Sequence, residues 1–112
     1  MPLLEITTNI NIENAQAIAL KASKLTAELL GKPEDYVMVK IHPKQILSFG
    51  GHNEPAAHIK LKSLGLAEDS TAEYSAKLCE FINTVLNIHS NRIYIEFSSP
   101  PRHMWGWDGK TF

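Results

Sequence analysis

Apolar residues recur at helical spacing, three or four positions apart, in two segments of the chain. In the first segment, within residues 12–31, these are Ala15, Ile18, Ala22, Leu25 and Leu29. Gly31 and Pro33 predict the end of this helix, because glycine closes helices readily and proline cannot continue them. In the second segment the apolar stripe is Tyr74, Leu78, Phe81 and Val85. Its start is predicted at residues 70–73, Ser-Thr-Ala-Glu, a pattern typical of a capping box.

Four shorter segments predict strands. Residues 3–7 are rich in β-prone residues, and residues 36–42, 58–65 and 92–97 alternate between apolar and polar positions. In residues 36–42 one face is Val37, Val39 and Ile41, and the other is Met38, Lys40 and His42. In residues 92–97 one face is Ile93, Ile95 and Phe97, and the other is Tyr94 and Glu96. Each of these strands is therefore expected to bury one face.

The two halves of the chain match under a shift of 56 residues, which aligns the two apolar helix stripes and the strands that follow them. The chain therefore reads as two β-α-β units in tandem. A strand, a helix and a second strand of this length imply a parallel pair with a crossover helix, and two such units can share one sheet. We expect a single domain over residues 1–112 of the α/β (α+β) class, a four-stranded mixed sheet with two helices on one face.

Two helices leave the other face of such a sheet uncovered. That face carries residues such as Met38 and Tyr94, and it is mixed rather than uniformly polar. A partly apolar open face favours burial against another surface. We expect self-association, with the repeated edge strands favouring a closed ring.

Composition excludes several classes of protein. The 112 residues are 44% hydrophobic and 21% charged, with 11 basic and 12 acidic side chains and no basic run, so neither nucleic acid nor a membrane is expected as a partner. The apolar runs are short and the start of the chain lacks the pattern of a secretory signal, which predicts a cytoplasmic protein. The single cysteine, Cys79, is expected to be a small packing residue. The five histidines show no ligand spacing, so no metal is expected, and no nucleotide or hydrolase motif is present.

The first residues, Met-Pro-Leu-Leu-Glu-Ile, have two interpretations. Proline is tolerated at the first residue of a strand, which gives Pro2 no special role. Alternatively, removal of Met1 would make the Pro2 nitrogen a terminal secondary amine held in a ring. These residues alone leave both interpretations open.

Several segments, in order along the whole chain, resemble the macrophage migration inhibitory factor and D-dopachrome tautomerase family of the tautomerase superfamily. They are Met1-Pro2, GKPEDY at 31–36, SFGG at 48–51, EPAA at 54–57, SLG at 63–65, RIYIEF at 92–97 and GWDGKTF at 106–112. The resemblance implies a β-α-β-β-α-β protomer assembled as a homotrimer, with an active site at each subunit interface. This architecture agrees with the tandem repeat and the uncovered sheet face.

The resemblance also implies the residues of a site. Pro2 matches the family's catalytic base, and Lys32 matches its pocket lysine, which would bind a substrate carboxylate or carbonyl oxygen. A terminal amine suits this role because its pKa starts lower than that of a lysine and falls further in an apolar or cationic pocket. Leu64 falls where the family uses a backbone group. The matches to the apolar wall of the pocket are Tyr94, Trp107 and Phe112.

The chain departs from the family pattern at several positions. Glu96 stands where an asparagine hydrogen-bonds substrate in the family, and an ionised glutamate can only accept hydrogen bonds. Trp105 stands in place of a small apolar residue, and could narrow the pocket or offer a stacking surface. We therefore expect weaker activity on bulky aromatic keto acids. Residues 56–59, Ala-Ala-His-Ile, replace a Cys-x-x-Cys motif, so dithiol chemistry is not expected.

The resemblance implies a cofactor-free isomerase that interconverts keto and enol groups, acting on phenylpyruvate-like or dopachrome-like substrates. The alternative is a cytokine-like trimeric binding protein, exported without a leader, with a weak or vestigial site and a receptor partner. Lys44 counts against this alternative, because a receptor-binding aspartate is found at that position in the family's cytokine.

Overall fold

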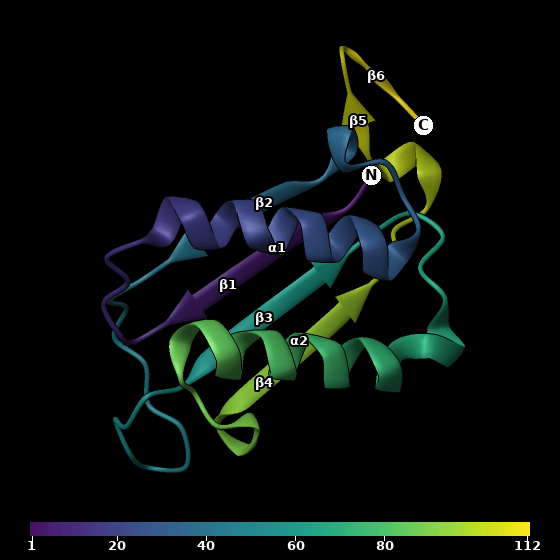
Figure 1. Cartoon of the computed structure of the whole chain (residues 1–112). Coiled ribbons are helices and arrows are strands. Elements are labelled where there is room, and N and C mark those ends of the chain that lie inside the picture. Colours follow the sequence, from purple (N-terminus) through teal and green to yellow (C-terminus); the bar gives the residue numbers. More distant parts are fainter.

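The computed structural model describes residues 1–112, and its four main strands form one mixed sheet in the order β2-β1-β3-β4 (Figure 1). The strands are β1 (Leu3–Thr8), β2 (Met38–His42), β3 (Ala57–Lys62) and β4 (Ile93–Ser98). β1 runs parallel to β2, and β3 runs parallel to β4. The antiparallel pairing of β1 with β3 joins the two units. The predicted tandem repeat in one four-stranded sheet is therefore confirmed.

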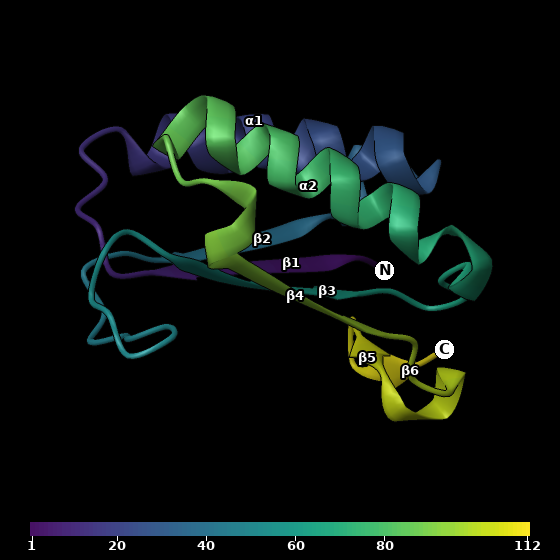
Figure 2. The same ribbon diagram turned by 90° about the horizontal axis from the view of Figure 1, so that it is seen from below.

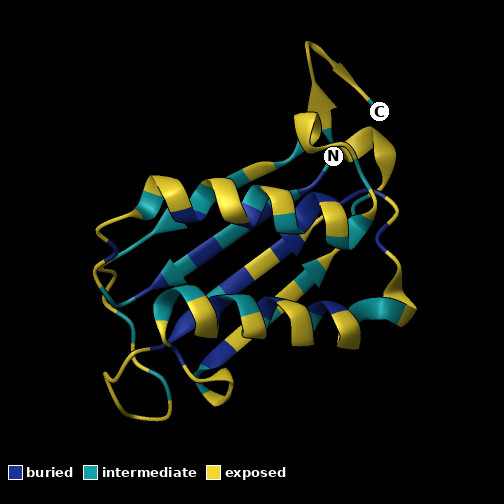
Figure 3. Cartoon of the chain, viewed as in Figure 1, coloured by how far each residue is buried: buried dark blue, intermediate teal, exposed yellow.

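The crossover in each unit is a helix, α1 (Ala15–Leu30) in the first and α2 (Thr71–Leu86) in the second. Figure 2 shows both helices on the same side of the sheet. Figure 3 shows that buried residues are concentrated in the central strands and on the inward sides of the helices. The largest buried side chains between these layers are Leu4, Ile6, Ile18, Ile59, Leu61, Leu78 and Ile82.

The helix α1 ends at Gly31, where the sequence predicts its end. Gly31 adopts a left-handed conformation with φ of 63°, and its N–H donates to the last turn of the helix. This conformation is costly for residues with a Cβ, which explains the glycine. The bend directs the next residue, Lys32, away from the helix axis.

The start of α2 differs from the predicted capping box. The helix begins at Thr71 with Ser70 at its N-cap, but the Ser70 side chain makes no capping hydrogen bond. Ser70 ends a short 3₁₀ turn, Glu68–Ser70, so it lacks the extended backbone from which a cap side chain reaches the helix N–H groups. The stripe also differs, because Ile82 is fully buried whereas Phe81 and Val85 are half-buried.

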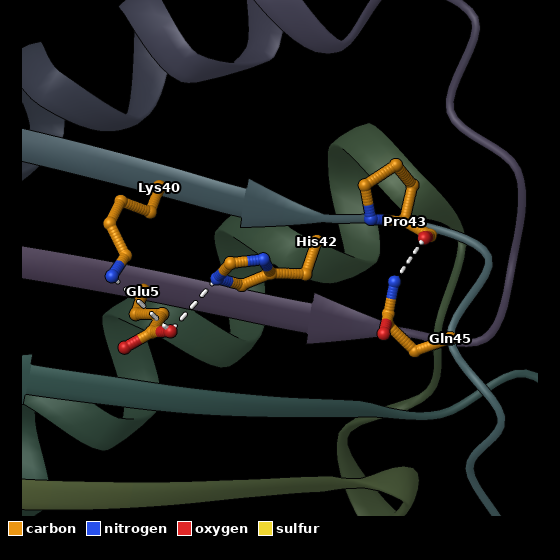
Figure 4. Close-up of polar contacts among 5 residues, drawn as sticks. All are labelled: Glu5, Lys40, His42, Pro43 and Gln45. Atoms are coloured by element: carbon orange, nitrogen blue, oxygen red, sulfur yellow. Dashed lines mark hydrogen bonds and ion pairs between the residues drawn. The ribbon is translucent and has the colours of Figure 1, made fainter.

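The face of the sheet opposite the helices is uncovered in this chain. Met38 and Tyr94 expose 61% and 67% of their surface on it. Charges alternate along one row across all four strands, namely Lys40, Glu5, Lys60 and Glu96. The Glu5 carboxylate lies 2.8 Å from the Nε2 atom of His42 and 3.8 Å from the Nζ atom of Lys40 (Figure 4). The open face is thus a mixture of apolar side chains and paired charges.

The long loop between β2 and β3 is held by side chains from both units. The Arg92 guanidinium donates hydrogen bonds to the carbonyl oxygens of Phe49, His52, Glu54 and Pro55. The amide of Asn9 donates to carbonyl oxygens of the same loop and accepts from the Ala56 N–H. A segment without regular structure is thereby fixed at its base.

The C-terminal tail folds into a small hairpin of β5 (Gly106–Trp107) and β6 (Lys110–Thr111), which the sequence did not predict. Figure 1 shows this hairpin next to the N-terminus. Neither helix has the length and apolar character that a membrane span needs.

Candidate active site

Pro2 lies just before β1 and is fully buried beneath Met1. Its carbonyl oxygen accepts a hydrogen bond from the Met38 N–H at 3.0 Å, which fixes the start of β1 against β2. Because proline has no N–H within a chain, its burial leaves no donor unsatisfied. Pro2 lines a cavity of about 310 Å³, here called the Pro2 cavity, whose other lining residues include Tyr36, Met38, Trp105 and Trp107.

Lys32 is the second residue after the end of α1, and its side chain points toward the segment that follows β3. Its Nζ atom donates to the Oγ atom of Ser63 at 2.9 Å and to the carbonyl oxygen of Leu64 at 2.5 Å. It lines a cavity of about 450 Å³, here called the Lys32 cavity, together with Leu64, Arg102, Trp107 and Phe112. The structure thus brings together Lys32, the Leu64 backbone and two of the three aromatic residues predicted for the wall.

Met1 lies between these cavities and lines both of them, as do Tyr36 and Trp107. Burial lowers the pKa of the Met1 ammonium below its ordinary value of 8.0, and the charge of Lys32, a hydrogen bond with Lys32 and the charge of Arg102 lower it further. Each of these effects disfavours a proton on the amine. The N-terminus of the chain therefore lies where a neutral amine is favoured.

Three aromatic rings lie at these cavities: Tyr36 and Trp107 line both, and Phe112 lines the Lys32 cavity. The ring of Trp107 stacks on Phe112 with 6.4 Å between centroids and meets Tyr36 edge-on at 5.9 Å. These distances are within the range of favourable aromatic pairs. Trp105 lies at the Pro2 cavity, with the Nζ atom of Lys62 at 5.5 Å from the centre of its ring.

Two predicted site residues lie elsewhere in the chain. Tyr94 packs on Phe49 with 4.7 Å between ring centroids, and the Glu96 carboxylate is 2.5 Å from the Nε2 atom of His58. Strand spacings and registers put the backbones of Tyr94 and Glu96 about 19 Å and about 14 Å from that of Pro2. Neither residue can contact Pro2 within one chain.

Sequence reasoning did not assign a role to Tyr36 or Arg102, both of which line the Lys32 cavity. Tyr36 ends the quoted segment GKPEDY, and its aromatic side chain next to Lys32 was the available signal. Arg102 belongs to a Pro-rich segment without periodicity, so no pattern indicated where its side chain would lie.

No group of three or more histidine, cysteine or acidic side chains is arranged to hold a metal ion. Cys79 is half-buried on α2 and packs at the edge of the core. Burial raises the pKa of its thiol, and a hydrogen bond with Ser75 opposes that shift only in part. The thiolate is therefore disfavoured.

The fold and the cavities at the N-terminus define an α+β protein of two fused β-α-β units. The model of the macrophage migration inhibitory factor family matches residues 1–112, and the chain belongs to that family. A macrophage migration inhibitory factor homolog from Trichinella spiralis is 40% identical over 114 aligned positions, which cover 100% of both chains.

Solved structures agree with this assignment. The structure of the macrophage migration inhibitory factor from Trichinella spiralis matches with a TM-score of 0.93 and 38% identity, over 98% of this chain and 99% of that one. A homologue from Prochlorococcus marinus matches with a TM-score of 0.93 and 38% identity, over 98% of both chains. The family in general includes proteins with tautomerase activity and with cytokine-like roles.

Proposed function

We propose that the chain is a cofactor-independent keto–enol tautomerase in which the nitrogen of Pro2, freed by removal of Met1, is the general acid and base. The observation that carries this proposal is the position of the N-terminus between two largely apolar cavities, beside the Lys32 ammonium. A base is most effective when its pKa lies near the operating pH. Burial and the charge of Lys32 lower the pKa of the Met1 amine, and a Pro2 amine would lie beside the same cation, which supports this role.

Removal of Met1 has a second effect in this proposal. Met1 is one of three residues that line both cavities, so its loss would connect the Pro2 nitrogen with the space beside Lys32. Because proline is a small residue, we expect Met1 to be removed. The ring of Pro2 would then hold its nitrogen in a fixed orientation.

The reaction needs only the substrate and these groups. The Pro2 nitrogen takes a proton from the carbon next to the substrate carbonyl, and the electron pair of that C–H bond forms the C=C bond of an enolate. The charge collects on the carbonyl oxygen, where Lys32 stabilises it. The protonated amine then returns the proton to that oxygen, which completes an isomerisation with no net gain or loss of atoms.

We propose aromatic keto acids of the phenylpyruvate or dopachrome type as the first substrates to test. Trp107 and Phe112 offer an aromatic surface beside Lys32, whose ammonium suits a carboxylate. Trp105 occupies space at the Pro2 cavity, which supports the expectation that bulky aromatic substrates react more slowly.

A homotrimer with sites at its subunit interfaces completes the proposal. Tyr94 and Glu96 lie too far from Pro2 to join its site within one chain, whereas a neighbouring copy could supply both. The exposure of Met38 and Tyr94 on the open sheet supports association. The second candidate function, a cytokine-like binding protein, is supported by the names of the curated relatives.

The test begins with the intact mass, because retained Met1 would block the base. Phenylpyruvate tautomerisation is then followed by ultraviolet absorbance for the parent and for Pro2→Gly, with Pro43→Gly as the matched control. We expect turnover in the parent and the control and a large loss in Pro2→Gly. Equal rates in all three proteins would refute Pro2 as the base, and no turnover in any of them would favour the binding protein.

A further inference from the structure

Arg102 provides a second cation at the Lys32 cavity. It begins a short 3₁₀ turn, Arg102–Met104, between β4 and the C-terminal hairpin, whereas Lys32 follows α1. The two cations therefore come from opposite halves of the chain and line one space. The charge of Arg102 also contributes to the lowered pKa of the N-terminal amine, which supports this proximity.

The guanidinium of Arg102 has no ion-pair or hydrogen-bond partner within the chain. Arg92 makes a clear contrast, since its guanidinium binds four carbonyl oxygens and holds a loop. None of the residues that line the Lys32 cavity is acidic. Its charged side chains are therefore all positive, and Arg102 keeps its full set of donors for a ligand.

Two cations beside a largely apolar surface repel each other, and an anion bound between them removes that repulsion. The Lys32 ammonium donates to Ser63 and Leu64, which fixes its position, and removal of Met1 with its hydrogen bond to Lys32 would leave the third N–H for a ligand. A guanidinium binds a carboxylate through two parallel hydrogen bonds. A substrate with one carboxylate can satisfy one of these cations well, whereas a substrate with two can satisfy both.

We infer that Arg102 is a specificity-determining residue that binds a second carboxylate, so that the site favours keto diacids over keto acids with a single carboxylate. This inference rests on the proposed tautomerase function and narrows its substrate class. The cavity of about 450 Å³ lies within the range of small-molecule sites. Because both cations line this one cavity, the inferred binding mode places one carboxylate of a diacid at Lys32 and the other at Arg102.

The competing role for Arg102 is an ion pair with Glu96 of a second copy across a subunit interface. Within the chain, the Glu96 carboxylate already has His58 as a partner, and Lys60 lies opposite it in the sheet. The positive charge of Arg102 is therefore not needed to balance that carboxylate.

The first experiment compares kcat/KM for oxaloacetate, a four-carbon keto diacid, with kcat/KM for phenylpyruvate. Arg102→Met is expected to lower the ratio of the two values about tenfold, the effect of losing one charge-assisted hydrogen-bond pair at an exposed site. Lys24→Met removes an exposed positive charge outside the cavity and is expected to leave the ratio at the parent value. An unchanged ratio in Arg102→Met would overturn the inference.

The second experiment measures binding without turnover. Calorimetry compares succinate with butyrate, which differ by one carboxylate, on the parent and on Arg102→Met. We expect the parent to prefer succinate and the variant to lose most of that preference. If the parent turns over phenylpyruvate but does not prefer succinate, the inference fails and the proposed function stands. If the succinate preference depends on Arg102 but no keto acid is turned over, the proposed function fails while the second anion site stands.

Sedimentation of the parent and of Arg102→Met distinguishes a role of Arg102 in ligand binding from a role in the subunit interface. An assembly that is unchanged in the variant supports a role in ligand binding. Dissociation of the variant, together with an unchanged preference for succinate, would make Arg102 an interface residue and overturn the inference.

Discussion

The ammonium of Lys32 donates a hydrogen bond to the carbonyl oxygen of Leu64, which ties the end of α1 to the turn that follows β3. Each residue belongs to a different half of the chain, so this bond fixes the cation that the proposed reaction uses with respect to the N-terminus. The same contact also satisfies the carbonyl group of Leu64, which is a buried residue. Lys32 therefore has a structural as well as a proposed chemical role.

Lys32→Met separates these roles. We expect kcat/KM for phenylpyruvate to fall about 100-fold, because the donor proposed to stabilise the enolate oxygen is lost. The free energy of unfolding should fall by about 1 kcal/mol, because Ser63 and Leu64 lose a donor. Ultraviolet assays and urea denaturation measure the two effects, with Lys24→Met as the control. A rate close to that of the parent would remove Lys32 from the proposed site.

The pH dependence of kcat/KM tests the N-terminal amine as base. Burial and the charge of Lys32 lower the pKa of the Met1 amine, and we expect both to act in the same direction on the Pro2 amine once Met1 is removed. We therefore expect activity to rise with pH through a midpoint below the pKa of an exposed N-terminal proline. In Lys32→Gln the residual activity should show a higher midpoint, although burial keeps part of the shift. An identical midpoint in both proteins would contradict the coupling between the two groups.

Trp105→Val tests whether Trp105 restricts the Pro2 cavity. The smaller side chain enlarges the cavity and removes the contact with Lys62. We expect kcat/KM for bulky aromatic keto acids to rise relative to that for small keto acids. Glu96→Asn should also change substrate preference if a neighbouring copy supplies that residue. If both variants showed the kinetics of the parent across several substrates, Trp105 and Glu96 would not belong to the substrate pocket.

Glu5→Gln tests the charges of the open sheet face. Burial of the Glu5 carboxyl raises its pKa, but the hydrogen bond with His42 and the charges of Lys40, His42 and Lys60 outweigh it, so the net pKa lies below 4.5. The ionised carboxylate therefore stabilises the fold above pH 4.5, and this contribution disappears as the pH falls through the lowered pKa.

For Glu5→Gln we expect a loss of at most about 1 kcal/mol at pH 7, because the pair is partly solvated, and almost none near pH 2. Thermal or urea unfolding over this pH range measures the difference. A difference that does not change with pH would show that Glu5 contributes through packing rather than charge.

The fold was predictable because each half of the chain has its own periodic pattern of apolar and polar residues. Ile18 and Ala22 in one helix, and Ile93 and Ile95 in one strand, lie where those patterns place them. Gly31 ends α1 for the reason that the sequence suggests. The side chain of Ser70 does not cap α2, because the preceding 3₁₀ turn has a geometry that a four-residue motif does not encode.

The candidate site was predictable only in part. Pro2, Lys32 and Phe112 were assigned through the family resemblance, since no periodic pattern connects the two ends of the chain. Arg102 was not assigned to the site, because its position depends on how the irregular C-terminal tail packs beside Lys32. The partners of Tyr94 and Glu96 depend on contacts between copies, which a single sequence does not display.

Asn9 and Arg92 bind the backbone of the loop between β2 and β3, which joins the two β-α-β units. These hydrogen bonds bear on whether the chain can be cut between its two units. Exposed loops usually tolerate cuts and insertions when few interactions hold their backbone. Here one residue from each half binds the backbone of the junction itself. The loop is therefore held jointly by the two halves, and a chain cut there would lose hydrogen bonds contributed by each of them, despite the internal symmetry of the sequence.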